Sequence, residues 1–164
     1  MASSAKPFFP ISGLVGADFN SASTDQKFEL GQTARGNSNT DWLYVQAGGA
    51  IDKHDLVTVD EDFSATAATA STAAAGHSVA VATGAAIAAS SYGWVCRAGS
   101  GTYVKVNAAA STAADALLNA TATAGHVGNA SSGVAIEGIV LTTAASASAG
   151  TLGAIINYPR TTES

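Results

Sequence analysis

The sequence predicts an all-β protein, a small antiparallel β-barrel or β-sandwich with an extended N-terminal arm. Three observations predict this fold. Short runs of aromatic and β-branched residues recur along the chain, and turns rich in Gly, Asn, Asp and Ser separate them. Apolar and polar residues alternate within several of these runs, as they do in half-buried strands. Ala is abundant, but it shows no apolar stripe with the 3.6-residue period of a helix.

The chain of 164 residues is long enough for one domain and an arm. We divide it into an arm, residues 1–26, and a β-domain, residues 27–164. Hydrophobic residues make up 47% of the chain, but about half of them are Ala, and a buried Ala removes little apolar area from water. The sequence therefore predicts a thin core, to which contacts between subunits add stability.

The arm contains two aromatic residues between prolines. Pro7 and Pro10 enclose Phe8 and Phe9, and proline fixes its own φ and biases the preceding residue toward extended backbone. Two interpretations stay open. The terminus is disordered and the aromatic pair is a chance feature, or it is an extended arm whose Phe8 and Phe9 bind a neighbouring molecule.

The first half of the β-domain reads as short strands with frequent turns. The loops are expected at Ala34–Asp41, Ala47–Ala50 and Ala70–Gly76, where Gly, Asn, Ser and Ala gather. Strict alternation places Val79 and Val81 on the same face of their strand. The strands are expected at Lys27–Leu30, Trp42–Gln46, Leu56–Val59, Phe63–Ala68 and Ser78–Thr83.

The second half predicts a hairpin, one short helix at most, and two closing strands. Tyr92–Arg97 and Thr102–Val106 flank a Gly-containing turn, which is a hairpin signal. The only candidate helix is the Ala-rich stretch Asn107–Ala116. Gly133–Thr142 is expected to be a strand with a bulge at Gly138. The last strand is expected at Leu152–Tyr158, with Pro159 ending it.

A short repeat also stands out. Ala75-Gly76-His77 recurs as Ala124-Gly125-His126, each time after a tract rich in Thr and Ala. The repeat marks equivalent turns in two halves of a barrel, or it arises by chance from the biased composition.

Charge and hydropathy exclude several classes of protein. Charged residues make up only 12% of the chain, the net charge is −5, and the basic residues are scattered, which argues against binding to nucleic acid. No apolar run is long enough to span a bilayer, and residues 1–20 hold no apolar signal-peptide core. We therefore expect folding in a reducing cytoplasm. The single Cys96 cannot form an intrachain disulfide and is expected to be a buried thiol.

The sequence predicts no catalytic residue, cofactor or metal. The acidic stretch Asp52–Asp62 leaves two interpretations open: its carboxylates are solvated turn residues, or they bind a hard cation such as Ca²⁺, although the spacing of a calcium-binding loop is missing. Asp55 is expected to bond to its own backbone ahead of Leu56. The histidines do not belong to any recognisable nucleophile motif; they are His54, His77 and His126.

Several stretches are similar to one family of viral proteins. Trp42–Asp60 (WLYVQAGGAIDKHDLVTVD) resembles a segment of small phage head proteins, and Ala75–Val106 continues the likeness through a YGWV strand. Ala113–Gly125 resembles a recurring turn of these proteins, and Gly138–Pro159 fits their closing strands. On these motifs the chain resembles the capsid decoration, or cement, proteins of tailed bacteriophages.

The resemblance implies a β-rich protein that binds the outside of a phage shell between capsomers, often as a trimer. Its implied partners are the major capsid protein and copies of itself, and its implied location is the capsid exterior after synthesis in the host bacterial cytoplasm. Candidate interface residues are Phe8, Phe9, Trp42, Tyr44 and Trp94. Two alternatives stay open: another virion component, such as a tail tube or fibre-head subunit, and a carbohydrate- or receptor-binding module with exposed aromatic residues.

Overall fold

The computed structural model describes residues 7–11, 14–73, 76–99, 103–129 and 134–162, and its regular structure is entirely β. Residues 1–6 of the predicted arm lie outside the described part. No helix in the described ranges has the length and apolar character to cross a membrane. The strands in chain order are β1 (Thr33–Gly36), β2 (Thr40–Ala47), β3 (Leu56–Val59), β4 (Ser64–Ala67), β5 (Ser78–Val81), β6 (Tyr92–Gly99), β7 (Lys105–Ala108), β8 (Leu118–Ala120), β9 (His126–Asn129), β10 (Ala135–Leu141) and β11 (Gly150–Thr162).

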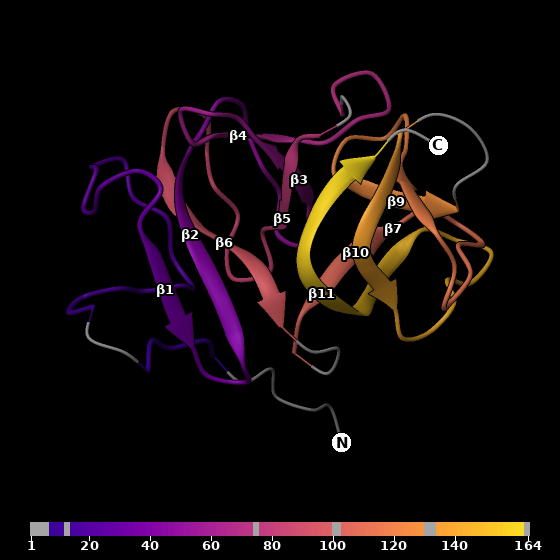
Figure 1. Cartoon of the computed structure of the whole chain (residues 1–164), viewed down its shortest axis with the longest axis horizontal. Coiled ribbons are helices and arrows are strands. Elements are labelled where there is room, and N and C mark those ends of the chain that lie inside the picture. The colour runs from indigo at the N-terminus through magenta and orange to yellow at the C-terminus, as the bar shows by residue number, and fades with distance from the viewer. Residues whose placement is uncertain (1–6, 12–13, 74–75, 100–102, 130–133, 163–164) are drawn as a thin grey trace.

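The first part of the fold is a closed barrel of six strands. Its wall runs β2–β4–β3–β5–β11–β6, and it closes because β6 pairs antiparallel with β2. All these pairs are antiparallel except β2–β4, which is parallel. Closure leaves no strand edge in the wall open to another chain. The predicted all-β barrel is therefore confirmed (Figure 1).

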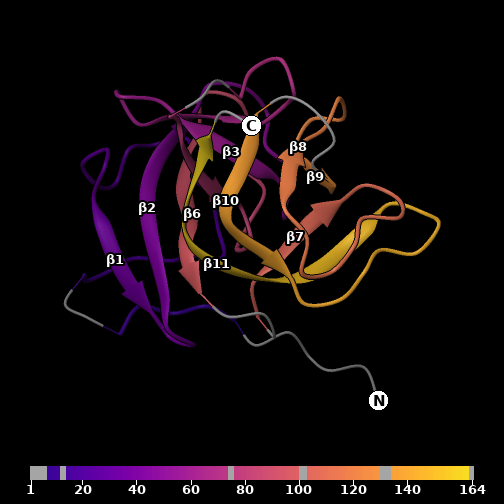
Figure 2. The ribbon, with the colours of Figure 1, turned by 45° about the vertical axis from the view of Figure 1, so that its right-hand side comes forward.

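The second part is a smaller ring that shares β11 with the first. It runs β7–β9–β8–β10–β11 and closes where β11 pairs back onto β7. The long, curved β11 lies between the two groups of strands in both views (Figures 1 and 2). One strand thus forms part of both walls.

The two parts repeat one pairing pattern. The circuit β2–β4–β3–β5–β6 has the same order and the same strand directions as β7–β9–β8–β10–β11, including a single parallel pair in each. The registers also correspond, with matched residues 56–62 positions apart along the chain. The matched partners are Val45↔Gly93 with Val106↔Leu152, Ala47↔Ala65 with Ala108↔Val127, and Val57↔Ala80 with Leu118↔Ile136.

The loops repeat as well. In the first unit, Ile51 and Ile87 exchange two backbone hydrogen bonds of 2.9 Å, which join the β2–β3 loop to the β5–β6 loop. The corresponding loops of the second unit are joined by two bonds of 2.7 Å, from Ser111 to Ser146 and from Ala145 to Thr112. The chain is therefore an internal duplication of one five-stranded unit in its topology.

This duplication does not explain the short repeat in the sequence. Gly76 precedes β5, whereas Gly125 directly precedes β9. The pairing pattern makes β10 the counterpart of β5, and β4 the counterpart of β9. Both glycines have a positive φ, 86° and 75°, so they share a turn conformation without occupying equivalent places.

Two apolar clusters form the core. The smaller one fills the first barrel with alternating residues of its strands, and Leu43, Val45, Val57 and Val95 belong to it. The larger one joins the interior of the second ring to the outer side of the first barrel. Many of its members are Ala or Val, as the predicted thin core requires.

The described residues that precede β1, which we call the N-terminal segment, cover an aromatic face on the outer side of β2 and β6. Phe19 stacks on Trp42 with ring centroids 4.6 Å apart, and Phe8 meets the same ring edge-on at 4.9 Å. Phe28 meets Trp94 at 5.3 Å. Such aromatic pairs add about 0.5–1.5 kcal/mol each beyond their buried area. This segment is therefore part of the folded core.

The same segment closes the outer edge of β1. Pro10 forms an antiparallel bridge with Gly36, and the Ile11 N–H donates to the Arg35 carbonyl at 2.9 Å. Proline has no N–H to offer to a further strand. Among the described strands, the end of the outer β1 edge is thus covered by a residue that blocks further pairing.

Most strands predicted from local patterns are confirmed. β2, β3, β4 and β5 fall within or around the predicted ranges. Val79 and Val81 share the larger cluster, while Ala80 between them belongs to the smaller one, as alternation requires. Cys96 is buried, also as expected.

Five predictions about elements are wrong: the four that follow, and the end of the last strand at Pro159. Lys27–Leu30 is not a strand, and the predicted loop Ala34–Asp41 contains most of β1 and the start of β2. The stretch Asn107–Ala116 is not helical: it begins in β7, whose pairing with β9 and β11 overrides the helix preference of Ala. The predicted hairpin of Tyr92–Arg97 with Thr102–Val106 does not form, because β6 pairs with β2, β5 and β11. Residues 100–102 lie outside the described part.

The bulge predicted at Gly138 is present, and it explains why Pro159 does not end the last strand. The register of β10 against β11 shifts between Glu137 and Ile139. In this bulge, three residues of β11, 157–159, lie opposite the single residue Gly138 of β10. Pro159 therefore lies at a position where β11 donates no backbone hydrogen bond to β10, so its missing N–H does not interrupt the strand. β11 continues to Thr162.

Candidate functional site

Two bulges direct Arg97 and Tyr158 out of their sheets toward each other. Asp41 faces Ala98 and Trp42 faces Cys96, so Arg97 is the extra residue of β6. Tyr158 is the middle residue of the β11 bulge, and its φ of 45° is in the left-handed region, which is unusual for an aromatic residue. Bulges and strained backbone of this kind are common where a side chain must be re-aimed for function.

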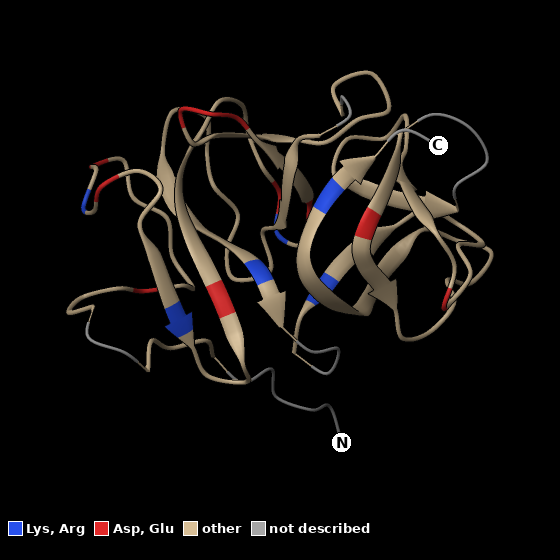
Figure 3. Cartoon of the chain, viewed as in Figure 1, with Lys and Arg blue, Asp and Glu red and all other residues tan. Residues whose placement is uncertain are grey.

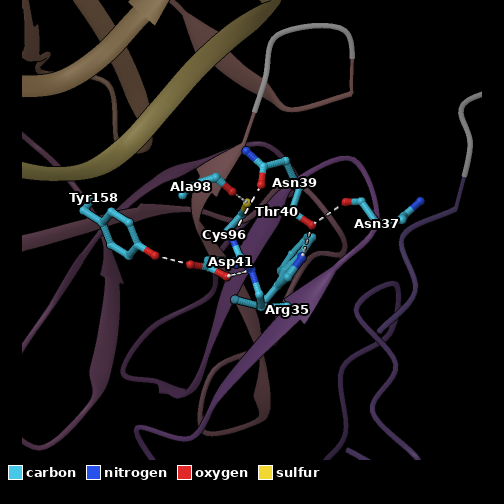
Figure 4. A network of polar contacts seen from close by, with 9 residues as sticks. Arg35, Asn37, Asn39, Thr40, Asp41, Cys96, Ala98 and Tyr158 are labelled. Atoms are coloured by element: carbon cyan, nitrogen blue, oxygen red, sulfur yellow. Dashed lines mark hydrogen bonds and ion pairs between the residues drawn. The ribbon is translucent and has the colours of Figure 1, made fainter. Parts of the chain in front are cut away.

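Asp41 holds this arrangement together across three strands. Its Oδ1 accepts from Arg35 Nε at 3.1 Å, and its Oδ2 accepts from the hydroxyl of Tyr158. Figure 4 shows Tyr158 and Arg35 meeting Asp41 from β11 and β1. The hydrogen bond to Asp41 raises the pKa of Tyr158, because losing the phenolic proton would place two anions side by side. Tyr158 is therefore a neutral hydrogen-bond donor at neutral pH.

Arg97 completes the site without an acceptor of its own. Its guanidinium carbon lies 5.4 Å from the centroid of the Tyr158 ring, in cation–π contact. Its Nε is buried and has no hydrogen-bond partner. Arg97, Arg35, Asp41 and Tyr158 line an open depression of about 320 Å³.

The surroundings of the depression form one outward surface, which we call the β11 face. Val140 and Ile155 lie directly opposite each other on β10 and β11, and they are 37% and 48% exposed. Arg160 pairs with Glu137 at 3.2 Å on the same strands. Figure 3 shows charged residues on β11, on the neighbouring β10 and β6, and on β1 and β2. The β11 face comprises the charged and aromatic residues lining the depression and cross-strand neighbours on and beside β11: Arg35, Asp41, Arg97, Lys105, Glu137, Val140, Ile155, Tyr158 and Arg160.

The aromatic residues expected at an interface lie elsewhere. Trp42, Tyr44 and Trp94 are buried in the large cluster, and Phe8 is only 8% exposed. They hold the N-terminal segment on the barrel and present no surface to a partner. Phe9 is 52% exposed, so contact through Phe9 stays a prediction.

The acidic stretch divides between two turns. Asp55 lies in the β2–β3 loop, where its Oδ2 accepts from the N–H of Asp52 at 2.9 Å and its Oδ1 accepts from Asn107 Nδ2 at 3.0 Å. Asp55 thus bonds to the turn backbone at Asp52, three residues back, instead of ahead of Leu56 as predicted, and its bond to Asn107 ties the first unit to β7. Asp60–Asp62 lie exposed in the β3–β4 turn. In the described ranges, no three His, Cys, Asp or Glu side chains are placed to hold a metal ion.

His54 lies at the junction of the two units. Its N–H donates to Ala82 at 2.8 Å, and its carbonyl accepts from Asn107 at 2.9 Å. The ring is half-buried, and its Nδ1 has no partner. Burial lowers the pKa of His54 to about 4, and the charges of Lys53 and Lys105 add to this effect.

The low pKa of His54 makes stability fall in acid. The unfolded chain takes up this proton near pH 6.5 and the folded chain only near pH 4, so stability is lost as pH falls through this window. For a half-exposed ring the loss is about 1–2 kcal/mol. His54→Asn should flatten this dependence, since Asn tolerates the φ of 74°. Urea denaturation of both proteins from pH 7.5 to 4 measures it.

Asp55 acts in the opposite direction. Burial raises its pKa, so its contribution to stability is larger in acid than at neutral pH. Asp55 is unchanged in both the wild type and His54→Asn. The difference in pH dependence between these two proteins therefore reports on His54 alone. Parallel curves for wild type and His54→Asn would contradict the assignment.

Sequence reasoning missed Arg35, Asp41, Arg97 and Tyr158 as a group. They come from four strands, and pairing of distant strands brings them together. The bulge at Gly138 and the neighbouring Pro159 were the only local signals.

Comparison of this chain with family models, with curated proteins and with solved structures finds no match.

Proposed function

We propose that this chain is a capsid decoration protein of a tailed bacteriophage, a structural protein that binds the outer surface of the shell between capsomers and stabilises it. The observation that carries the proposal is the β11 face. It is exposed and held in place by Asp41, Tyr158 and two bulges. Tyr and Arg beside exposed aliphatic residues are typical of protein-binding surfaces.

The scaffold suits this role. Two closed rings and a covered β1 edge leave the described strands without an edge that invites aggregation. Low charge lets many copies lie close together on one particle without strong repulsion. Repeated copies that each bind modestly stabilise a shell through their number.

The burial of the tryptophans weighs against a carbohydrate-binding module. Such a module is expected to present clustered aromatic residues, but Trp42 and Trp94 are enclosed by the N-terminal segment. The Cys96 thiol does not support a role as a nucleophile, because it is buried and burial raises its pKa.

Binding to phage heads tests the proposal. Purified protein is mixed with heads from a phage strain that lacks the gene, and the pellet after sedimentation is quantified. We expect saturable co-sedimentation and a higher melting temperature of the heads. Unchanged melting and no co-sedimentation at any ratio would refute the function.

A further inference from the structure

Arg97 is a cation whose acceptor is missing from the described chain. The nearby carboxylate, Asp41, is already used, because one oxygen accepts from Arg35 and the other from Tyr158. Arg97 Nε is nevertheless buried and without a partner. A buried donor left unpaired costs about 1–3 kcal/mol. Nε itself is enclosed, so an acceptor from outside would meet the Arg97 guanidinium in the open depression that this residue lines.

The β11 face is positive on an acidic protein. It holds four of the seven basic residues of the chain and only two carboxylates, which leaves two excess positive charges where the whole chain carries −5. Both carboxylates are paired with arginines of the same face. This pattern favours an acidic ligand.

An apolar centre adjoins the cations. Val140 and Ile155 are cross-strand neighbours, and Ile155 lies on the same strand as Tyr158. A ligand with a carboxylate and a neighbouring aliphatic side chain would contact both. Such a combination is typical of an extended protein segment.

The internal duplication supplies an independent argument. In the first unit, the outer side of β6 at Trp94 and Cys96 belongs to the cluster covered by the N-terminal segment. The register makes Gly153 and Ile155 of β11 the counterparts of these two residues. The described chain covers the first face and leaves the second exposed.

From these observations we infer that the β11 face is a docking site for an acidic, extended segment of the shell protein, whose carboxylate accepts hydrogen bonds from Arg97 while an adjacent aliphatic side chain packs on Val140 and Ile155. This inference rests on the proposed function for the identity of its partner. The charge-assisted pair provides specificity, and the aliphatic contact adds buried area.

The first arm of the test compares charge-removal variants in head binding. Arg97→Gln should weaken binding to heads by about 10-fold or more, since a charged hydrogen bond to the partner is lost. Lys27→Gln is the matched control, because Lys27 is exposed and lies outside the β11 face. Arg97→Lys keeps the positive charge but loses the planar guanidinium with its paired N–H donors. Its affinity for heads should therefore lie between those of the wild type and Arg97→Gln. Melting curves confirm that each variant is folded.

The second arm needs no heads. A blocked hexapeptide of alternating Glu and Leu is titrated into ¹⁵N-labelled protein, with a Gln and Leu peptide as control. We expect the acidic peptide to shift the Arg97 Nε–H signal and the Ile155 amide. Added NaCl should weaken this effect.

The outcomes separate the two proposals. If wild type binds heads and Arg97→Gln binds as well as Lys27→Gln, the docking site is refuted while the function stands. If wild type does not bind heads, the function fails, and the absence of peptide-induced shifts would also overturn the docking site. If Arg97→Gln abolishes self-association in sedimentation velocity but not head binding, the occupant is a second copy, and the shell-protein assignment is overturned.

Discussion

Phe19→Ala should lower the free energy of unfolding by about 3–4 kcal/mol, as truncation of a fully buried Phe does. Phe19 is the side chain through which the N-terminal segment stacks on Trp42, and it also meets Trp94 edge-on. Its loss opens a cavity that the rigid barrel wall cannot fill. Urea denaturation followed by Trp fluorescence measures the effect, because both tryptophans report on this cluster.

Phe9→Ala is the matched control from the same segment. Phe9 is exposed, so its truncation should change the free energy of unfolding by less than about 0.5 kcal/mol. Equal and small effects for the two variants would contradict the placement of the N-terminal segment in the core. A loss of head binding in Phe9→Ala at unchanged stability would support the prediction that Phe9 contacts a partner.

Gly138→Ala should destabilise the protein by about 2–3 kcal/mol. Gly138 has a φ of 86°, and an added Cβ would lie 2.7 Å from the Asn157 carbonyl oxygen. Left-handed backbone costs a residue with a Cβ about 1–2 kcal/mol, and the clash with backbone adds to it. Thermal and urea denaturation measure the loss.

Gly150→Ala is the control for this variant. Gly150 also lies in β11, but a Cβ there meets nothing within 4 Å, and we expect a change within about 0.5 kcal/mol. The Gly138 bulge also places Tyr158, so Gly138→Ala should weaken head binding even where the protein is folded. Wild-type stability of Gly138→Ala would show that the bulge does not need glycine.

The sequence predicted the strands whose evidence is local. Alternation at Ser78–Thr83 sets the faces of β5 without reference to any other strand, and the aromatic run in β2 is a strand in any sheet. The predicted hairpin of Tyr92–Arg97 with Thr102–Val106 is wrong, because strand pairing depends on segments that are distant in the sequence. β6 pairs with β2 instead. The Ala-rich composition of Asn107–Ala116 predicted a helix, but this stretch begins in strand β7, where Ala108 is buried in the wall of the second ring.

The N-terminal segment shows the same limit. Alternation places Phe8 and Phe9 on opposite sides of an extended chain, and the structure agrees, with Phe8 buried and Phe9 exposed. The sequence does not reveal that the surface under Phe8 is the chain's own Trp42. Arg97 and Tyr158 were missed for a related reason, since bulges on different strand pairs bring them together.

The copy number of this chain in purified phage particles tests the central claim most directly. Quantitative mass spectrometry against labelled standards gives the ratio of this chain to the major capsid protein in intact particles and in isolated heads. A capsid decoration protein predicts a fixed, near-stoichiometric ratio that is the same in both samples. Absence from heads, or only a few copies per particle, would contradict the account.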